Sequence, residues 1–257
     1  ATEAASASRL ASDHRRCSGG DLYWAKAARQ KGDSFLERLF EMATVEQVAL
    51  QGESRIVLSG ISWELYEALR ENEENWRVRM AYDEGTLELM SPSPNHEAIS
   101  KLVAQMIEAL MEELGIPRRS LRSTTWKRHG LAKGLEADEC YYILNHHRLP
   151  RDRDLDLTID PPPDLAIETE VTRTVVKRLR IYAALGVPEI WRWRVKTGLI
   201  AYSLDAEGKY IEREHSLNLP LLRVKDLEPF LEFNLADDET AWIRRFRAWV
   251  RERFPAS

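Results

Sequence analysis

The stretch 162-PPDLAIETEVTRTVVKRLRIYAALGVPEIWRWRV-195 decides the fold class, because its residue pattern changes twice. Leu165 to Val171 is a short, mostly apolar run after a group of prolines, which is typical of a strand. Arg173 to Leu185 has helical character and is closed by Gly186. Glu189 to Val195 then alternates as a second strand. The stretch therefore predicts strand, helix and strand in succession.

Further strands and helices flank this stretch on both sides. Upstream we predict strands, helices and one extended segment, at Arg55–Leu58 (strand), Ser62–Glu74 (helix), Trp76–Tyr82 and Thr86–Met90 (a hairpin), Ile99–Leu114 (helix), Leu121–Lys127 (extended) and Asp138–Leu144 (strand). Downstream we predict strands at Leu199–Ser203 and Tyr210–Glu214 and helices at Asp226–Leu231 and Glu239–Arg253. This order indicates an α/β or α+β domain with a mixed sheet flanked by helices.

Composition limits the classes of protein that fit. With 257 residues, 44% of them hydrophobic, the chain can bury one sizeable core. Its net charge of -5 means that a nucleic-acid partner needs a local basic patch. Basic residues cluster in 118–133, 173–180 and 192–196, although each cluster could equally be a solvated charged face.

The cysteines and apolar runs bear on the compartment. Cys17 and Cys140 are too few for a disulfide framework or a zinc cluster, which favours a reduced, cytoplasmic protein. No apolar run approaches the roughly 18 residues of a membrane-spanning helix, and we find no signal peptide.

Residues 1–41 differ from the rest in being rich in Ala, Ser and Arg. Met42 is followed by ATVEQVALQG, which reads like an ordinary start of translation. We therefore expect residues 1–41 to be a non-native or disordered extension and residues 42–257 to form a single domain. The alternative is a genuine N-terminal helix at about Tyr23 to Phe40.

Three acidic residues form the candidate site. If strands 138–144 and 165–171 pair antiparallel with Leu144 opposite Asp164, then Asp138 lies opposite Glu170 and diagonal to Glu168, all on one face. Carboxylates that close repel one another, and a divalent cation such as Mg²⁺ would relieve the repulsion. The alternative is that these acids pair with Lys or Arg, or lie on a solvated face.

Several motifs in the same order resemble one known family. They are GTLELMSPSPNHEAIS (85–100), EADECYYI (136–143), PPDLAIETEVT (162–172) and IYAALGVPEIWRW (181–193). These segments resemble the Uma-two family of restriction endonucleases, which is expanded in cyanobacteria and has the PD-(D/E)XK nuclease fold. The resemblance extends from about Arg55 to Leu231. It implies a Mg²⁺- or Mn²⁺-dependent endonuclease that hydrolyses DNA phosphodiester bonds. It also implies a homodimer.

The resemblance also assigns roles to individual residues. Asp138 and Glu168 match the family's metal ligands, and Glu170 occupies the position of the classical lysine. In this family the lysine often comes from the following helix instead, where this chain has Arg178 next to Lys177. Arginine stays charged and cannot act as a base. Either Lys177 reaches the site, or Arg178 acts electrostatically, or activity is impaired.

Two helix residues and one strand residue complete the candidates. Glu97 could be an extra carboxylate at the site, but an acid there also favours the positive N-terminus of its helix. His96 could contribute too, although a structural hydrogen bond is the commoner role. Asp164 is about 13 Å along an extended strand from Glu168, so we expect it to be structural. The competing function is a catalytically impaired nuclease fold that binds nucleic acid or a partner.

Overall fold

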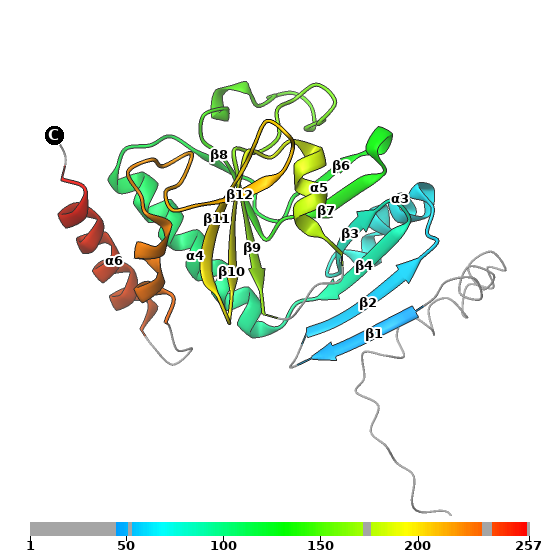
Figure 1. Cartoon of the computed structure of the whole chain (residues 1–257), viewed down its shortest axis with the longest axis horizontal. Coiled ribbons are helices and arrows are strands. Elements are labelled where there is room, and N and C mark those ends of the chain that lie inside the picture. Colours follow the sequence, from blue (N-terminus) through cyan, green and yellow to red (C-terminus); the bar gives the residue numbers. More distant parts are fainter. Residues whose placement is uncertain (1–44, 51–52, 172–175, 233–237, 256–257) are drawn as a thin grey trace, which may run out of the picture. The chain divides into compact units, whose positions relative to one another are not determined.

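Two six-stranded sheets form within residues 45–50, 53–171, 176–232 and 238–255, which are the residues that the computed structural model describes (Figure 1). The first sheet is antiparallel throughout, in the order β1 (Val45–Leu50), β2 (Glu53–Ser59), β4 (Thr86–Ser91), β3 (Arg79–Asp83), β7 (Lys133–Glu136) and β6 (Thr125–Arg128). The second sheet has the order β12 (Tyr210–Arg213), β11 (Gly198–Leu204), β10 (Glu189–Arg194), β9 (Leu165–Glu170), β8 (Glu139–Tyr142) and β5 (Arg119–Ser120). In it only β9 and β10 run parallel, so this sheet is mixed.

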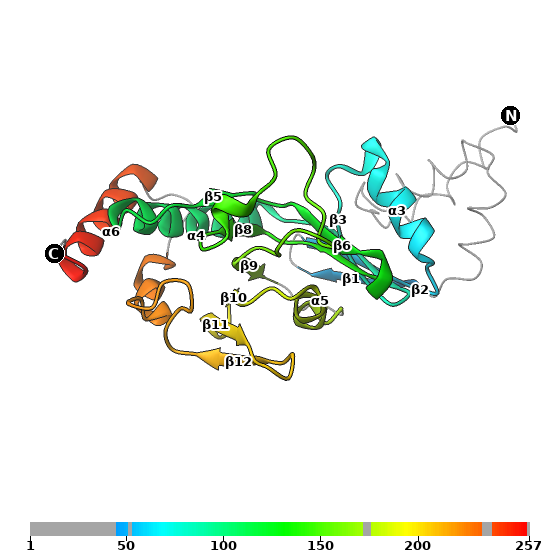
Figure 2. The same cartoon turned by 90° about the horizontal axis from the view of Figure 1, so that it is seen from above.

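Four α-helices accompany the sheets in the described part of the chain. They are α3 (Trp63–Glu71), α4 (Pro94–Glu113), α5 (Arg178–Leu185) and α6 (Glu239–Arg253). Helices α4 and α6 pack against each other beside the second sheet (Figures 1 and 2). Among these helices, none combines the length and the apolar character needed to cross a bilayer.

Side-chain alternation in β8 and β9 divides the core between the two faces of the second sheet. Tyr141, Leu165 and Ile167 belong to a buried cluster with residues of α4 and α6. Cys140 and Ala166 belong to a second cluster with residues of α5. Odd-numbered residues of these strands therefore face α4, and even-numbered ones face α5. This parity decides which side each acidic residue of the strands points to.

The helices begin and end at the residues that local chemistry favours. Ser62 Oγ accepts a hydrogen bond from Leu65 N (3.2 Å) at the start of α3. Ser93 Oγ does the same for His96 N (3.2 Å) at the start of α4. Such caps satisfy amides that have no partner inside the helix. Gly186, with φ of 79°, ends α5 in the left-handed conformation that glycine adopts without strain.

The predicted α+β class is confirmed, and several boundaries differ. The strands form two sheets instead of one. Trp76 is 68% exposed and lies at the end of a 3₁₀ turn, so the predicted strand 76–82 begins only at Arg79. The predicted helix 226–231 is a 3₁₀ helix, Val224–Phe230, with Pro229 inside it. Helix α5 begins at Arg178, not at 173, and residues 172–175 and 1–41 lie outside the described residues.

Replacing Gly134 in β7 by Ala is expected to lower the free energy of unfolding by about 1–3 kcal/mol. A Cβ there would lie 2.4 Å from Tyr66 Oη, and the Tyr66 ring is fully buried, so it has no room to move away. Gly130→Ala is the matched control, because nothing lies within 4 Å of its added Cβ. Urea unfolding measures both, and equal stability of the two variants would contradict the prediction.

Candidate functional site

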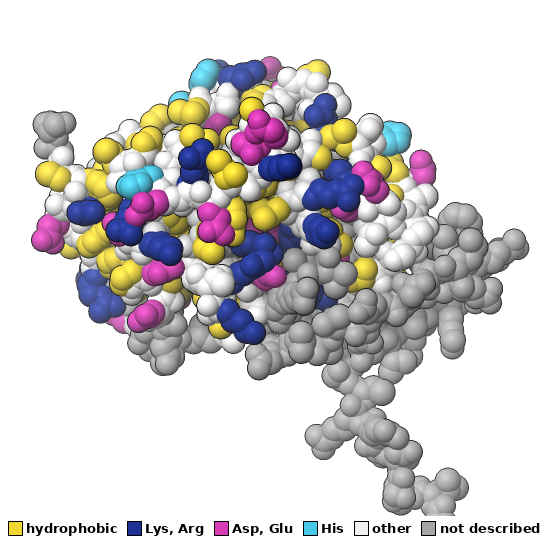
Figure 3. Space-filling view, viewed as in Figure 1, with side chains coloured by type: hydrophobic (Ala, Val, Ile, Leu, Met, Phe, Trp, Pro, Cys, Tyr) yellow, Lys and Arg dark blue, Asp and Glu magenta, His cyan; other side chains and the backbone are white. Residues whose placement is uncertain are grey.

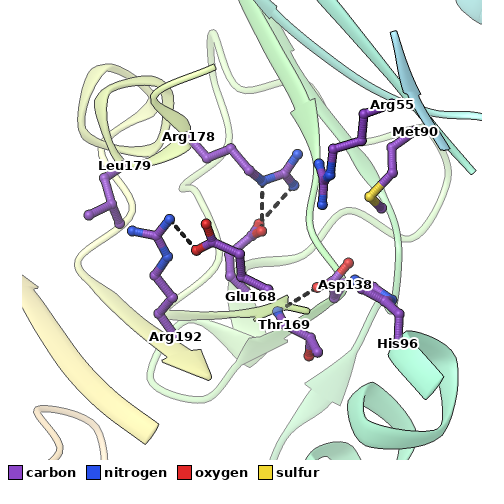
Figure 4. A pocket seen from close by; sticks show the side chains of 10 residues that line it. Arg55, Met90, His96, Asp138, Glu168, Thr169, Arg178, Leu179 and Arg192 are labelled. Atoms are coloured by element: carbon purple, nitrogen blue, oxygen red, sulfur yellow. Dashed lines mark hydrogen bonds and ion pairs between the residues drawn. The ribbon is translucent and has the colours of Figure 1, made fainter. Parts of the chain in front are cut away.

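A small pocket collects charged side chains from both sheets and two helices (Figure 4). Its lining residues come from β2, β4, α4, β9, α5, β10 and the residue before β8, and are Arg55, Met90, His96, Asp138, Glu168, Thr169, Glu170, Arg178, Leu179 and Arg192. The cavity measures about 20 Å³, which is room for about one water molecule. The pocket contains all three acids of the predicted site.

The predicted antiparallel pairing of the two acidic strands is confirmed, but its register is wrong by two residues. Tyr141 pairs with Leu165. Continued to the strand end, this register places Asp138 in line with Glu168 and not with Glu170. Asp138 and Glu168 are even-numbered and share the α5 side of the sheet.

Strand β8 also ends earlier than predicted, at Tyr142, because of Asp164. Its carboxylate accepts hydrogen bonds from Ile143 N (2.6 Å) and Asn145 N (2.9 Å), so these amides do not continue the ladder. Asp164 also accepts a bond from the Asn145 side chain. Asp164 therefore has the structural role that we expected. Its carboxylate accepts hydrogen bonds from the turn after β8, and it does not line the pocket.

Glu168 is held by a two-pronged ion pair with Arg178 (Figure 4). Arg178 Nε and Nη2 donate to the two carboxylate oxygens at 2.6 and 2.8 Å, and Tyr182 Oη also donates to Oε1. Arg178 reaches further, to the carbonyl oxygen of Glu136. Burial raises the pKa of Glu168 above its ordinary value, and the attraction of Arg178 offsets part of this effect. Planar guanidinium suits such bidentate pairing.

Asp138 is also enclosed by donors. Its Oδ2 accepts a bond from Thr169 N at 2.6 Å and lies 3.4 Å from His96 Nε2, while Oδ1 pairs with Arg79. Burial alone would raise the pKa of Asp138, but His96 and Arg79 lower it to about 2. Burial alone would lower the pKa of His96, but the Asp138 carboxylate raises it to about 9. The pair is therefore ionised at neutral pH.

The remaining acidic candidates do not join Asp138 and Glu168 at one point. Glu170 pairs with Arg192 and, at 2.7 Å, with Arg194 Nε. Glu97 lies at the start of α4 with a half-exposed side chain, where it pairs with Arg79 at 2.8 Å. Within the described residues, no group of three or more His, Cys, Asp or Glu side chains is arranged to hold a metal ion. The predicted three-carboxylate cluster is therefore wrong.

Of the two basic candidates, the structure brings only Arg178 into the pocket. Lys177 precedes α5, is exposed and is not among the lining residues. The possibility that Lys177 substitutes for the missing lysine therefore has no support in this arrangement. Arg178, which remains charged, is the cation next to Glu168.

The two buried carboxylates are nevertheless of the type that binds a divalent cation. Mg²⁺ needs only one or two protein carboxylates, because it retains several waters. Asp138 and Glu168 are two buried carboxylates at aligned positions of neighbouring strands. Their oxygens accept bonds from Arg178, Arg79 and Thr169, so a cation would have to compete with Arg178 for Glu168.

Basic residues around the pocket are largely neutralised. Figure 3 shows dark blue and magenta side chains intermingled over the face in view. Members of each predicted basic cluster form ion pairs, among them Arg118–Glu112, Lys127–Glu67, Lys133–Asp83, Arg180–Glu84 and Arg194–Glu170. A pair such as Arg180–Glu84, in which both side chains are exposed, contributes little to stability. All of these pairs leave less free positive charge for phosphate contacts than the sequence suggests.

The sequence does not predict that four further side chains, those of Tyr182, Arg192, Arg55 and Arg79, lie beside the acidic residues. Tyr182 lies in a family segment, but only the fold shows that its hydroxyl reaches Glu168. Arg192 alternates with tryptophans in β10, and that pattern indicates only a polar face. Arg55 and Arg79 come from the first sheet, and no spacing in the sequence connects them to β8 or β9.

Glu139, the residue after Asp138, is expected to make stability depend on pH. Burial raises its pKa to about 7. The folded state therefore binds the proton more tightly than the unfolded state, so this stabilisation is complete below about pH 4.5 and lost as the pH rises through about 7. Glu139→Gln should be more stable than the parent by about 2–3 kcal/mol at pH 8 and nearly equal at pH 4.5. Urea unfolding at both pH values measures this; a constant difference would contradict it.

Comparison with known proteins places the chain in a family. A family model named Uma2 and described as "Putative restriction endonuclease" matches residues 63–238. Among solved structures, a putative nuclease of the DUF820 group from Anabaena variabilis ATCC 29413 is 18% identical, with a TM-score of 0.44, and the alignment covers 74% of this chain and 99% of that one. A search of curated proteins gave no match.

Proposed function

Because the chain belongs to the Uma2 family of restriction-endonuclease-like proteins, we propose that it is a Mg²⁺- or Mn²⁺-dependent endonuclease that hydrolyses phosphodiester bonds in DNA. Asp138 and Glu168 are the proposed metal ligands. The observation that carries the proposal is that Asp138, directly before β8, lies in line with Glu168 in the neighbouring strand β9. Both are buried, and both line one pocket with Arg178 and Arg192.

Several charged residues in and beside the pocket have a proposed part in this chemistry. Asp138 and Glu168 would hold the divalent cation, which would supply Lewis-acid polarisation of a phosphate oxygen and activation of water. Arg178 and Arg192 supply fixed positive charge for the negative charge that develops on the phosphate. Neither arginine can take a proton from water. Glu170 assists by orienting Arg192 and Arg194, and Glu97 positions Arg79 beside Asp138.

One observation favours a second candidate function. Arg178 neutralises Glu168 through both carboxylate oxygens, at the position where the cation would have to bind. A chain in which this pair does not open would hold nucleic acid without cutting it. The second candidate is therefore a nuclease-fold binding module with impaired cleavage.

A plasmid assay separates the two. The full chain is incubated with supercoiled plasmid and Mg²⁺, Mn²⁺ or EDTA, beside Glu168→Gln and the exposed-turn control Glu207→Gln. Cleavage that needs a metal, persists in the control and disappears in Glu168→Gln supports the endonuclease. A shifted plasmid band with no cleavage in any metal supports the binding module.

We also propose an assembly and a compartment. A homodimer would present two pockets to the two strands of a duplex, and sedimentation of the purified chain with and without DNA tests it. The cytoplasm is proposed from the low cysteine content, and Cys140 is a buried free thiol, as a reducing compartment allows.

A further inference from the structure

A second and larger cavity lies on the other side of Asp138. It measures about 250 Å³, against about 20 Å³ for the pocket described above. Asp138 and Glu139 border it together with side chains from α4 and from the segment before β6, including Lys101, Arg122 and Ser123. The small pocket holds about one water, whereas the larger cavity has room for a planar ring of the size of a nucleobase.

The wall of this cavity contains a carboxylate with an unsatisfied oxygen. Glu139 is odd-numbered in β8, so it points to the α4 side, away from Glu168. It is only 4% exposed, and its Oε2 has no hydrogen-bond partner among the residues that the structure describes. The nearest cation is Arg122, whose Nε is 3.8 Å from Oε1 and whose side chain is 74% exposed. A buried acceptor without a donor is costly. Because Oε2 has almost no exposed surface, a ligand's N–H group meets it only after the Glu139 side chain turns toward the cavity, and that bond would remove the cost.

The rim of the cavity has the opposite character. Lys101 and Arg122 are exposed there, and Lys101 forms no ion pair with the described residues. Exposed basic side chains of this kind contact phosphate oxygens. The cavity therefore suits a ligand with N–H donors at one end and a phosphate at the other.

We propose that this cavity binds one nucleotide of the nucleic-acid substrate outside the base stack, with the base edge on Glu139 and a phosphate at Lys101 and Arg122. The proposal rests on the proposed function for the identity of the ligand as nucleic acid. Unstacked bases are read by hydrogen bonds to their pairing edges. A carboxylate selects among them by the donors that each base presents.

Guanine is the base that matches Glu139 best. It presents two neighbouring N–H donors on its pairing edge, as a carboxylate with two oxygens requires. Adenine and cytosine present one amino group beside an acceptor, and a carboxylate accepts from such an amino group. Thymine presents a single donor between two carbonyl oxygens, which repel the carboxylate. The expected order of affinity is guanine, then adenine and cytosine, then thymine.

Binding of dGMP and dTMP to the full chain, measured calorimetrically in EDTA at pH 8, tests the proposal. We expect dGMP to bind about tenfold more tightly than dTMP. Glu139→Gln should bring this ratio close to one, Lys101→Ala should weaken both nucleotides by a similar factor, and Glu207→Gln should change neither. Circular dichroism checks that Glu139→Gln is folded.

The outcomes distinguish this inference from the proposed cleavage. Equal affinity for the two nucleotides, or discrimination that survives Glu139→Gln, would overturn the nucleotide site. Because no metal is present, a chain that never cuts DNA can still give the expected ratio. Conversely, metal-dependent plasmid cleavage without any dGMP binding would overturn the nucleotide site and leave the endonuclease standing.

Discussion

Arg178→Met is expected to lower the free energy of unfolding by about 3–5 kcal/mol at pH 7. Arg178 occupies both oxygens of Glu168, and the two side chains are 12% and 8% exposed. Without the guanidinium, Glu168 remains as a buried carboxylate with Tyr182 as its donor. Methionine fills a similar length with apolar atoms, so the loss comes from the uncompensated charge and not from a cavity. Urea unfolding of the parent and the variant measures the effect.

A double variant shows whether the buried charge causes this loss. Arg178→Met combined with Glu168→Gln removes both charges, and replacing both members of a buried pair costs far less than removing one. We expect the double variant to be clearly more stable than Arg178→Met alone, with a coupling energy of about 1–3 kcal/mol in the cycle. Additive losses from the two single changes would show that the pair does not act as a unit.

The stability of the single variant Arg178→Met should depend on pH differently from that of the parent. Burial raises the pKa of Glu168, and removal of Arg178 takes away the charge that opposes this rise. A folded-state pKa above the unfolded one gives stability at low pH that is lost as the pH rises through the folded pKa. The deficit of Arg178→Met relative to the parent is therefore expected to be larger at pH 8 than at pH 5.

Local patterns in the sequence predict most of the helices and strands. Helix α6 has the predicted bounds, Glu239–Arg253, because Asp238 caps it and its apolar residues recur at helical spacing. Strands β9 and β10 begin at the predicted Leu165 and Glu189. The parallel pairing of these two strands depends on contacts across the sheet, which no short pattern contains. Strand β7 was missed because KGLE has no alternation and is buried at every position.

The candidate site was predictable only in part, for a related reason. Parity along the strands predicts that Asp138, Glu168 and Glu170 share one face, and the family resemblance is what singles out Asp138 and Glu168 as metal ligands. The register between the two strands depends on pairing across the sheet, and the end of β8 depends on the Asp164 carboxylate, which binds the amides of Ile143 and Asn145; no local pattern contains either. The arginine that neutralises Asp138 comes from β3, 59 residues earlier in the chain. Such long-range partners decide whether a carboxylate is free for a metal.

Asp138→Asn is expected to reduce metal-dependent cleavage by about 10³-fold or more. The change removes one of two proposed ligand carboxylates, and a metal's contribution of several kcal/mol corresponds to that factor. The amide keeps the shape and can still accept the hydrogen bond from Thr169 N, so the effect is on charge and not on packing. Initial rates of plasmid cleavage in Mg²⁺ measure it, with Glu207→Gln as the control.

Stability provides the check on this interpretation. The Asp138→Asn change would leave Glu97 as the one remaining anionic ion-pair partner of His96 and Arg79 among the described residues, and the pKa of His96 would fall from about 9. His96 could then become neutral, which removes one buried charge and limits the loss of stability. The variant should therefore remain folded at pH 8 and bind Mn²⁺ more weakly than the parent in calorimetry. If cleavage is retained and Mn²⁺ binding is unchanged, Asp138 is not a metal ligand. The pocket would then contribute to nucleic-acid binding through its arginines.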